Sequence, residues 1–242
     1  MFDSVARYHG DRPLGRVLDA GTGAHSLAWV ARVAQSWVAV TADPYAYDAL
    51  KGSHASGNGQ LVLGRWEDET LLDGQVFDVV LCDYLIGAVD RFTPYFQVGI
   101  LERLRRHCAG RLYLIGLEPW PSSAPTDGGQ ILLDMARLRD AAFLLAGNRP
   151  YREYPSAWVA HTLGGAGYAV QSVKHFGNLY KHGHVTAQLR VAERYAQKAP
   201  AGALRAGLLA EIDRVRRRAA ACSELVSGVR ISSDYIIVAE TA

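Results

Sequence analysis

The sequence predicts an α/β fold with a doubly wound, mostly parallel sheet of seven strands, helices on both faces and a helical insert before the last strand. Short apolar runs of strand length alternate with segments whose apolar residues recur at helical spacing. This alternation is typical of a parallel sheet covered by helices. Three of the apolar runs end in an acid, at Asp19, Asp43 and Asp83. Because ligands of such sheets bind beyond the carboxyl ends of the strands, these acids indicate a binding site at one edge.

Length and composition suit a single α/β domain over residues 1–242. Hydrophobic residues make up 49% of the chain and charged residues 21%, which is enough apolar surface for a core and too little charge for a disordered chain. The formal net charge of +2 is too small to indicate a nucleic-acid or membrane partner. The three cysteines lie far apart in the sequence. This spacing predicts reduced thiols in a cytoplasmic protein and no disulfide framework. No apolar run approaches the roughly 20 residues that span a bilayer.

The most informative segment is Arg16–Val30, in which a short apolar run is followed by two glycines and an amphipathic stretch. Glycines directly after a buried strand let the backbone turn sharply and approach a ligand. The helix that follows aims its unpaired N–H groups at whatever the turn holds. The segment therefore predicts a nucleotide-cofactor loop, formed by Asp19, Ala20, Gly21, Thr22 and Gly23.

Two cofactor classes compete for this loop. The dinucleotide fingerprint requires a third glycine where this chain has Ser26, and Asp19 suits a cationic amino group better than a pyrophosphate. The acid-x-Gly-x-Gly turn resembles the first motif of the class I (Rossmann-like) S-adenosylmethionine (SAM) dependent methyltransferases, although the usual third glycine of that family falls at His25. The resemblance implies that SAM is the cofactor and S-adenosylhomocysteine the product. A NAD-dependent oxidoreductase is the alternative.

Asp43 is the second strong signal. It lies 22 residues after Gly21, close to the spacing of about 20 residues at which an acid binds the ribose hydroxyls of an adenosine cofactor. A carboxylate at the end of a strand can accept hydrogen bonds from both hydroxyls. The alternative is that Asp43 and Pro44 only begin a turn.

Two further stretches complete the expected cofactor site. A strand over residues 61–64 precedes Trp66, Glu67 and Asp68. In the family that the chain resembles, an acid at this place meets the adenine amino group, which implies stacking by Trp66 and an acceptor in Glu67 or Asp68. A solvated acidic turn is the alternative. The strand over residues 77–84 carries Asp83, which the resemblance places beside the transferred methyl group. Members of this family that methylate exocyclic amines of nucleic acids often carry an Asn/Asp-Pro-Pro-aromatic motif at this place. This chain has Asp83 but neither proline, and the resemblance therefore argues against methylation of exocyclic amines of DNA bases.

The remaining elements follow from apolar spacing and from glycine and proline positions. We expect helices over residues 3–9, 27–34, 94–108, 131–145 and 204–219, and strands over 37–42, 111–117, 168–173 and 231–239. The helical insert covers about residues 180–230. The family resemblance implies that the last strand runs antiparallel beside the fifth.

Candidate groups for the methyl acceptor come from two sets of residues. Three histidines, a tyrosine and a lysine occur within residues 175–184, just after the sixth predicted strand, and from them we take His182, His184 and Tyr180 as candidate catalytic groups. A polar surface loop is the alternative. We expect no metal here, because no acid or cysteine accompanies the histidines at ligand spacing. The aromatic residues expected to line the acceptor pocket are Tyr8, Tyr84, Trp120 and Tyr180.

The expected function is methylation of an oxygen or nitrogen of a small molecule by direct displacement. One alternative is a methyltransferase of RNA or protein that docks through an arginine-rich helix carrying Arg205, Arg214, Arg216, Arg217 and Arg218. Another is a SAM- or nucleotide-binding module without catalysis. The near-neutral charge makes a nucleic-acid partner unexpected, no membrane partner is expected, and a homodimer is possible.

Overall fold

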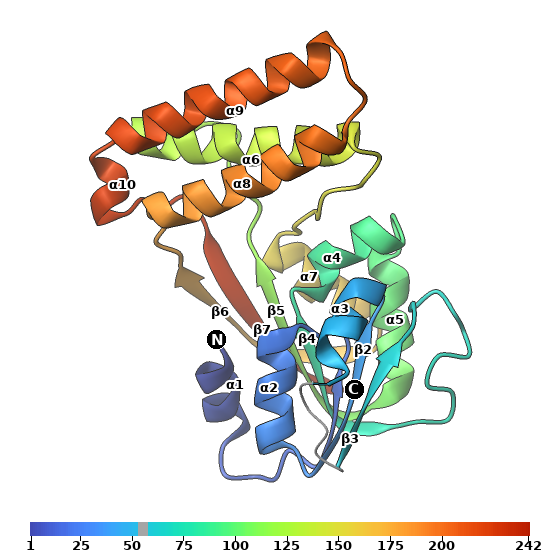
Figure 1. Cartoon of the computed structure of the whole chain (residues 1–242). Helices are drawn as coiled ribbons and strands as arrows, with labels where there is room; N and C mark the ends of the chain where they lie inside the picture. Colours follow the sequence, from blue (N-terminus) through green and yellow to red (C-terminus); the bar gives the residue numbers. More distant parts are fainter. Residues whose placement is uncertain (53–57) are drawn as a thin grey trace. The chain divides into compact units, whose positions relative to one another are not determined.

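The computed structural model describes residues 1–52 and 58–242 and contains one seven-stranded sheet with the order β3-β2-β1-β4-β5-β7-β6. This sheet and its flanking helices confirm the predicted α/β fold class (Figure 1). The strands are β1 (Arg16–Asp19), β2 (Ser36–Thr41), β3 (Gly59–Leu63), β4 (Phe77–Asp83), β5 (Cys108–Leu117), β6 (Tyr168–Gly177) and β7 (Ser233–Thr241).

Strand directions bring the predicted acids to one edge of the sheet. The four pairs formed by β1 with β2, β1 with β4, β2 with β3 and β4 with β5 are parallel. Asp19 and Asp83 end β1 and β4, and Asp43 follows β2, so all three stand at the carboxyl ends of neighbouring strands. Strand β7 pairs antiparallel with β5, as the family resemblance implied.

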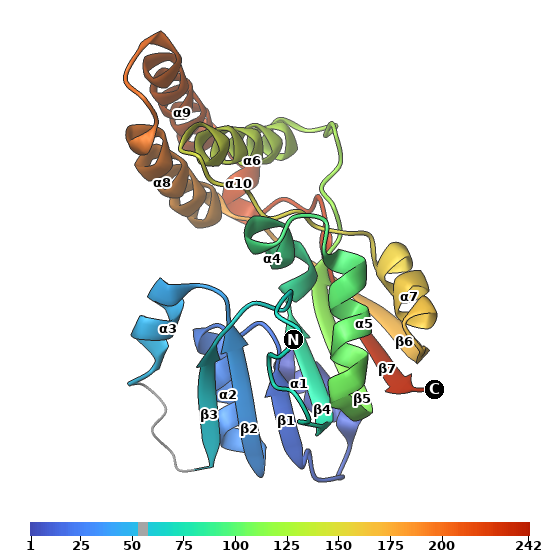
Figure 2. The ribbon, with the colours of Figure 1, turned by 90° about the vertical axis from the view of Figure 1, so that its right-hand side faces the viewer.

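Helices cover both faces of the sheet. Helices α1 (Phe2–His9) and α2 (Ala24–Val33) lie on one face, and α5 (Gln97–His107) and α7 (Ser156–Gly165) lie on the other (Figure 2). Fully buried side chains of successive strands form the core between them. They include Leu18, Val80, Leu112 and Ile237.

Two short helices beside the predicted site were not expected from the sequence. Helix α3 (Pro44–Leu50) begins at the Asp43-Pro44 dipeptide, with Asp43 as its N-cap and Pro44 in its first turn. Helix α4 (Leu85–Phe92) begins directly after β4, with Tyr84 at its N-cap in the left-handed region at φ 51°. The left-handed residue breaks the chain direction between strand and helix without a glycine.

The chain divides into two compact units. Unit 1 contains Met1–Glu118, Tyr151–His175 and Asp234–Ala242, and unit 2 contains Pro119–Pro150 and Phe176–Ser233. Unit 2 consists mainly of helices α6 (Asp127–Leu145), α8 (His182–Lys198), α9 (Ala203–Ala221) and the short α10 (Glu224–Ser227). Helices α6, α8 and α9 pack against one another around a separate apolar core.

The segment after the sixth predicted strand is only partly a loop. Strand β6 continues to Gly177 and therefore includes His175, and α8 begins at His182. Across the described parts of the chain, none of the helices combines the length and the apolar character needed to cross a membrane.

Candidate functional site

The predicted glycine loop is held in place by hydrogen bonds from both sides. The Ala20 N–H donates to the Leu81 carbonyl on β4, and the Thr22 N–H donates to the Val40 carbonyl on β2, each at 2.8 Å. The indole N–H of Trp66 donates to the Ala20 carbonyl at 2.7 Å. These bonds fix the backbone of the loop between β2 and β4.

The two glycines of the loop serve different purposes, and neither has a positive φ. A Cβ on Gly21 would lie 2.7 Å from Cδ1 of Leu85, so the glycine permits close packing against α4. Gly23 is the extended N-cap of α2, and its N–H donates to Oγ of Ser26 at 3.0 Å. A Cβ on Gly23 would meet no described atom within 4 Å. Gly21 is therefore needed for packing, whereas Gly23 borders open space.

A cavity of about 330 Å³ lies at the carboxyl ends of β1, β2 and β4, at the lower end of the volumes usual for small-molecule sites. It brings together most of the predicted cofactor residues. Those that line it are Ala20, Gly21, Thr22, Gly23, Asp43, Trp66 and Asp83, together with the predicted acceptor residue Tyr84. Other lining residues include Thr41, Ala46, Arg65, Leu85, Val89, Phe92, Phe96 and Tyr151.

Asp19 lies beneath this loop with no solvent exposure. Neither carboxyl oxygen forms a hydrogen bond of normal geometry with a described residue, although the Thr22 and Ser26 hydroxyls and the Gly21 N–H are near enough to act on its charge. Burial raises the pKa of Asp19 to about 7; the nearby Thr22 and Ser26 hydroxyls oppose this shift, and the charge of Asp83 adds to it. A buried carboxylate without a partner is costly. Asp19 does not itself line the cavity, whose wall begins at the next residue, Ala20.

Asp43 combines a structural role with a place in the cavity. Its Oδ1 accepts a hydrogen bond from the Tyr45 N–H at 2.9 Å and so caps α3. The same side chain lines the cavity. A carboxylate has two oxygens with several acceptor positions, so capping the helix does not prevent Asp43 from accepting hydrogen bonds from ribose hydroxyls.

The expected adenine contacts are only partly placed at the cavity. Trp66 lines it, but its side chain is 6% exposed and packs on the His107 ring at 5.8 Å. Glu67 accepts from the Thr93 hydroxyl and lies 3.5 Å from the Arg65 guanidinium. Asp68 accepts from the Thr70 N–H and hydroxyl at 2.9 and 2.7 Å. Neither acid lines the cavity, so this placement favours the acidic-turn alternative for Glu67 and Asp68.

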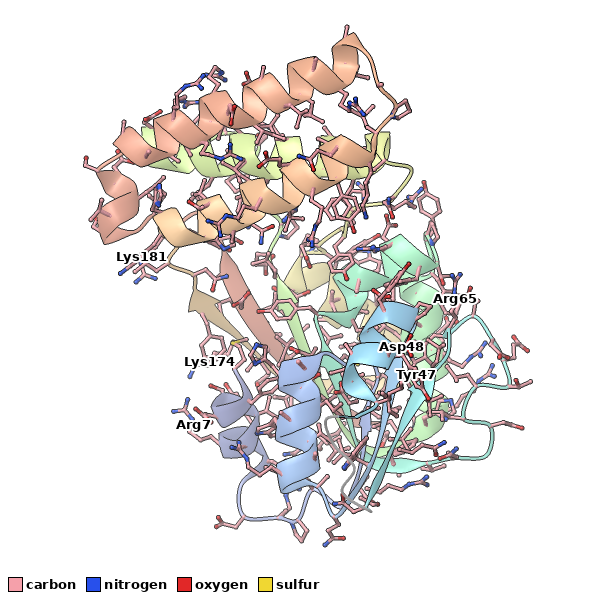
Figure 3. All side chains as sticks on the ribbon, viewed as in Figure 1. Arg7, Tyr47, Asp48, Arg65, Lys174 and Lys181 are labelled. Carbon is pink, nitrogen blue, oxygen red and sulfur yellow. The ribbon has the colours of Figure 1, made fainter. Side chains whose placement is uncertain are left out.

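Arg65 and the end of α4 border the same part of the cavity. The Arg65 guanidinium, labelled in Figure 3, donates to the Phe92 carbonyl at 3.3 Å. Arg65, Phe92, Thr93 and Phe96 all line the cavity. This part therefore offers aromatic rings and a cation where the sequence suggested acids.

Negative charge gathers where β4 ends. Burial raises the pKa of Asp83 to about 6, with His25 opposing the shift and Asp234 adding to it. Burial also raises the pKa of the Tyr84 phenol well above its usual value, and the Asp234 carboxylate, which accepts from that phenol, raises it further. Tyr84 holds a left-handed backbone that costs a residue with a side chain about 1–3 kcal/mol. Such strain next to a cavity is typical of functional sites.

The other predicted acceptor residues are distributed differently. Tyr180 is 8% exposed, and its ring meets those of Trp120 and His184 at 5.1 and 4.8 Å within unit 2. Its backbone pairs with Val229, which makes Tyr180 a core residue of that unit. His182 is exposed at the start of α8, and Tyr8 on α1 does not line the cavity. Of these predicted catalytic and acceptor-binding residues, only Tyr84 lines the cavity.

His184, a predicted catalytic residue, lies in unit 2. Burial lowers the pKa of its imidazole, and the positive charge of Arg139 lowers it further. His184 therefore stays neutral over more of the physiological pH range than an ordinary histidine. Its ring packs on Tyr180.

Comparison with solved structures identifies the fold. The YcgJ protein from Bacillus subtilis superposes with a TM-score of 0.58 at 15% identity, covering 99% of this chain and 96% of YcgJ. The mycolic acid cyclopropane synthase CmaA1, solved in complex with S-adenosylhomocysteine and CTAB, gives a TM-score of 0.56 at 15% identity, with 96% and 80% covered. The cyclopropane synthase MmaA2 from Mycobacterium tuberculosis gives 0.56 at 15% identity, with 95% and 79% covered.

Sequence comparisons add no family assignment: no family model matches the chain, and no curated protein matches it significantly. The structural likeness agrees with the strand order, the antiparallel last strand and the position of the cavity. This chain has the fold of the class I SAM-dependent methyltransferases.

Proposed function

We propose that this protein is a SAM-dependent methyltransferase that transfers a methyl group to an oxygen or nitrogen of a small molecule. The observation that carries the proposal is the cavity lined by the glycine loop, Asp43 and Asp83, with the buried Asp19 directly before the first lining residue of that loop. A SAM molecule fits this set of groups. Its ammonium would give the Asp19 carboxylate a positively charged partner. Its ribose hydroxyls would donate hydrogen bonds to Asp43, and its sulfonium would be attracted by the negative charge of Asp83.

Methyl transfer itself requires binding and alignment from the protein, and an acceptor that is protonated at rest also requires a base. Bound SAM supplies a methyl group already activated by its sulfonium, so transfer to an acceptor is a one-step displacement that depends on alignment. The fixed glycine loop holds one end of the ligand. Apolar side chains of α4 and the following turn, among them Leu85, Val89 and Phe96, exclude water from the reacting atoms.

The arginine-rich helix α9 gives little support to the RNA or protein alternative. Arg214 pairs with Glu211, Arg216 with Glu193 and Asp213, and Arg218 with Asp127 and Asp134. Arginines that already neutralise acids of their own unit have less charge to offer to phosphates. We therefore keep a small-molecule acceptor as the proposal.

Calorimetric titration with SAM and with NAD tests the cofactor. We expect saturable SAM binding and no NAD binding. Asp43→Asn is the informative variant, because an asparagine can still cap α3 while the negative charge is lost. We expect it to weaken SAM binding by about 1–3 kcal/mol.

The matched control is Asp48→Asn on the same helix. Asp48 is exposed, forms an ion pair with Lys51 at 2.7 Å and is labelled in Figure 3. We expect this variant to bind SAM like the wild type. Saturation by NAD without a response to SAM would refute the proposal. Accumulation of S-adenosylhomocysteine in the presence of an acceptor would show that the protein catalyses methyl transfer and does not only bind SAM.

A further inference from the structure

Three polar side chains of unit 1 meet beside the end of β5. Glu118 directly follows β5, Ser156 begins α7, and His175 lies on β6. The Nε2 atom of His175 lies 2.9 Å from Oε1 of Glu118 and 3.1 Å from Oγ of Ser156. The Ser156 N–H also donates to Oε1 of Glu118, at 3.1 Å. Glu118 therefore connects the end of β5, the start of α7 and the imidazole.

The chemistry of this cluster fixes which ring nitrogen can act as a base. Burial alone would raise the pKa of Glu118, but hydrogen bonds from Ser156 and His175 outweigh it and hold the pKa below its usual value. A carboxylate only accepts hydrogen bonds, so a neutral His175 must carry its proton on Nε2. The lone pair then lies on Nδ1, for which no partner exists among the described residues. About half of the His175 side chain (47%) is exposed.

The position of the cluster relates it to the cavity. Strands β4 and β5 are neighbours with Asp83 opposite Ile115, and neighbouring strands are about 4.8 Å apart. Glu118 follows three residues after Ile115, and Asp234 of β7 stands opposite Leu117. Glu118 therefore lies at the same edge of the sheet as Asp83 and Tyr84. Glu118, Ser156 and His175 do not themselves line the cavity that Asp83 and Tyr84 line.

Among the residues that the structure describes, few other charged or titratable groups face the imidazole. Besides Glu118 and Ser156, the Tyr235 ring of β7 lies 6.3 Å from it. Lys174 precedes it on β6 and points outward from the strand (Figure 3). Successive side chains of a strand point to opposite faces, so Lys174 and His175 face different surroundings.

On the basis of the proposed function, we infer that His175 is the proton acceptor of the reaction and that Glu118 is its positioning residue. The acceptor class is a small molecule whose nucleophilic oxygen or nitrogen still carries a proton at neutral pH. Nδ1 of His175 takes that proton while the oxygen or nitrogen forms a bond to the methyl carbon. The carbon–sulfur bond breaks, and its electron pair stays on sulfur as the neutral thioether. The imidazolium, stabilised by Glu118, returns its proton to solvent.

The first test needs no acceptor. Long-range ¹H–¹⁵N spectra of ¹⁵N-histidine-labelled protein report which ring nitrogen carries the proton. We expect the neutral His175 ring to be protonated on Nε2 in the wild type, and this preference to be lost or weakened in Glu118→Gln. A wild-type ring protonated on Nδ1 would overturn the inference, because the proposed base would then have no lone pair.

The second test measures formation of S-adenosylhomocysteine from a panel of phenols, primary amines and thiols with graded pKa. We expect His175→Ala to lower turnover of acceptors that are protonated at the assay pH by about 100-fold or more, with little loss for thiols that are already ionised. Glu118→Gln should lower it by about 10- to 100-fold, through misplacement of the ring, and shift the pH–rate profile. His161→Ala, an exposed histidine on α7, is the matched control and should behave like the wild type.

Two outcomes distinguish the inference from the proposed function. If the wild type does not bind SAM, the proposed function itself is wrong. If the wild type binds SAM but His175→Ala turns over protonated acceptors at the control rate, only the assignment of the base is wrong. Where no acceptor of the panel reacts, the position of the His175 proton decides. Thermal unfolding of each variant separates loss of the base from loss of the fold.

Discussion

At the scale of single residues, Asp19 shows a conflict between stability and ligand binding. Its carboxyl is fully buried, and neither of its oxygens forms a hydrogen bond of normal geometry with a described residue, an arrangement that a fold selected only for stability would avoid. The arrangement is reasonable if a cationic ligand completes it. The cost to the folded protein then depends on pH, because a protonated Asp19 carries no charge.

The direction in which stability changes with pH follows from the pKa values of Asp19 in the folded and unfolded states. Burial raises the pKa of Asp19 from an ordinary 3.8 to about 7 in the folded state. Between these values the folded protein binds more protons than the unfolded chain, so its stability falls as the pH rises from about 4 to about 7. Above pH 7 the charged carboxylate costs up to about 4 kcal/mol.

We therefore predict that Asp19→Asn raises the free energy of unfolding of the ligand-free protein at pH 8 relative to the wild type. At pH 5 the same variant should change the free energy of unfolding much less. The same variant should bind SAM more weakly at pH 8, since it lacks the negative charge that the proposed function pairs with the ammonium. Chemical denaturation at both pH values measures the first effect and calorimetry the second. Asp48→Asn serves as the control for charge removal alone. Equal pH dependence in wild type and Asp19→Asn would show that Asp19 does not carry this cost.

At the scale of elements, the sequence predicts those parts of the site whose role follows from residue type and spacing. Asp19 and Asp83 end their strands as expected, and Asp43 follows β2 as expected. Helix α4 was missed because Tyr84 takes the left-handed turn that a glycine would have signalled. Helix α3 begins at Asp43-Pro44, for which the sequence offered a turn only as the alternative to a binding role, although an aspartate cap followed by proline also begins helices.

The histidine run shows a different limit of sequence reasoning. His175 and His182 are seven residues apart in the chain, and the sequence grouped them as one candidate loop. The structure places His175 in β6 of unit 1 and His182 on α8 of unit 2. The partner of His175 is Glu118, which is distant in sequence. Only tertiary structure shows that pairing.

The glycine loop allows a sharper test than its sequence suggested. Gly21→Val would place a Cβ against Leu85 and disturb α4, so a loss of SAM binding could reflect damage to the fold. Gly23 borders both the cavity and open space. We predict that Gly23→Val keeps the wild-type unfolding midpoint within a few degrees and reduces SAM affinity at least tenfold, about 1.4 kcal/mol.

Calorimetry and thermal unfolding of the same preparation measure both quantities. Gly52→Val is a suitable control, because a Cβ there also meets no described atom within 4 Å and Gly52 does not line the cavity. A Gly23→Val protein that is folded and binds SAM normally would place the cofactor elsewhere.

At the scale of the whole molecule, the crossings between the two units coincide with residues of chemical interest. The chain leaves unit 1 after Glu118 and after His175, and re-enters it at Tyr151 and Asp234. Tyr151 lines the cavity, Asp234 interacts with Tyr84, and Glu118 holds His175. The sequence predicted the insert after β6 but did not associate α6 with it, because their apolar faces meet only in the folded protein.

Because the two units have separate apolar cores, we predict that SAM protects their amides from hydrogen exchange to different extents. The core of unit 2 is formed by α6, α8 and α9, whereas all residues that line the cavity belong to unit 1. A ligand at 100 times its dissociation constant stabilises the folded state that binds it by about 2.7 kcal/mol. Amides that exchange only when this state opens then exchange about 100-fold more slowly. In hydrogen–deuterium exchange we therefore expect SAM to slow residues 20–23 and α4 strongly, and α8 and α9 little. Asp43→Asn should reduce the protection in unit 1 at the same SAM concentration. Equal protection of α8 and α9 would show that the two units open as one cooperative body.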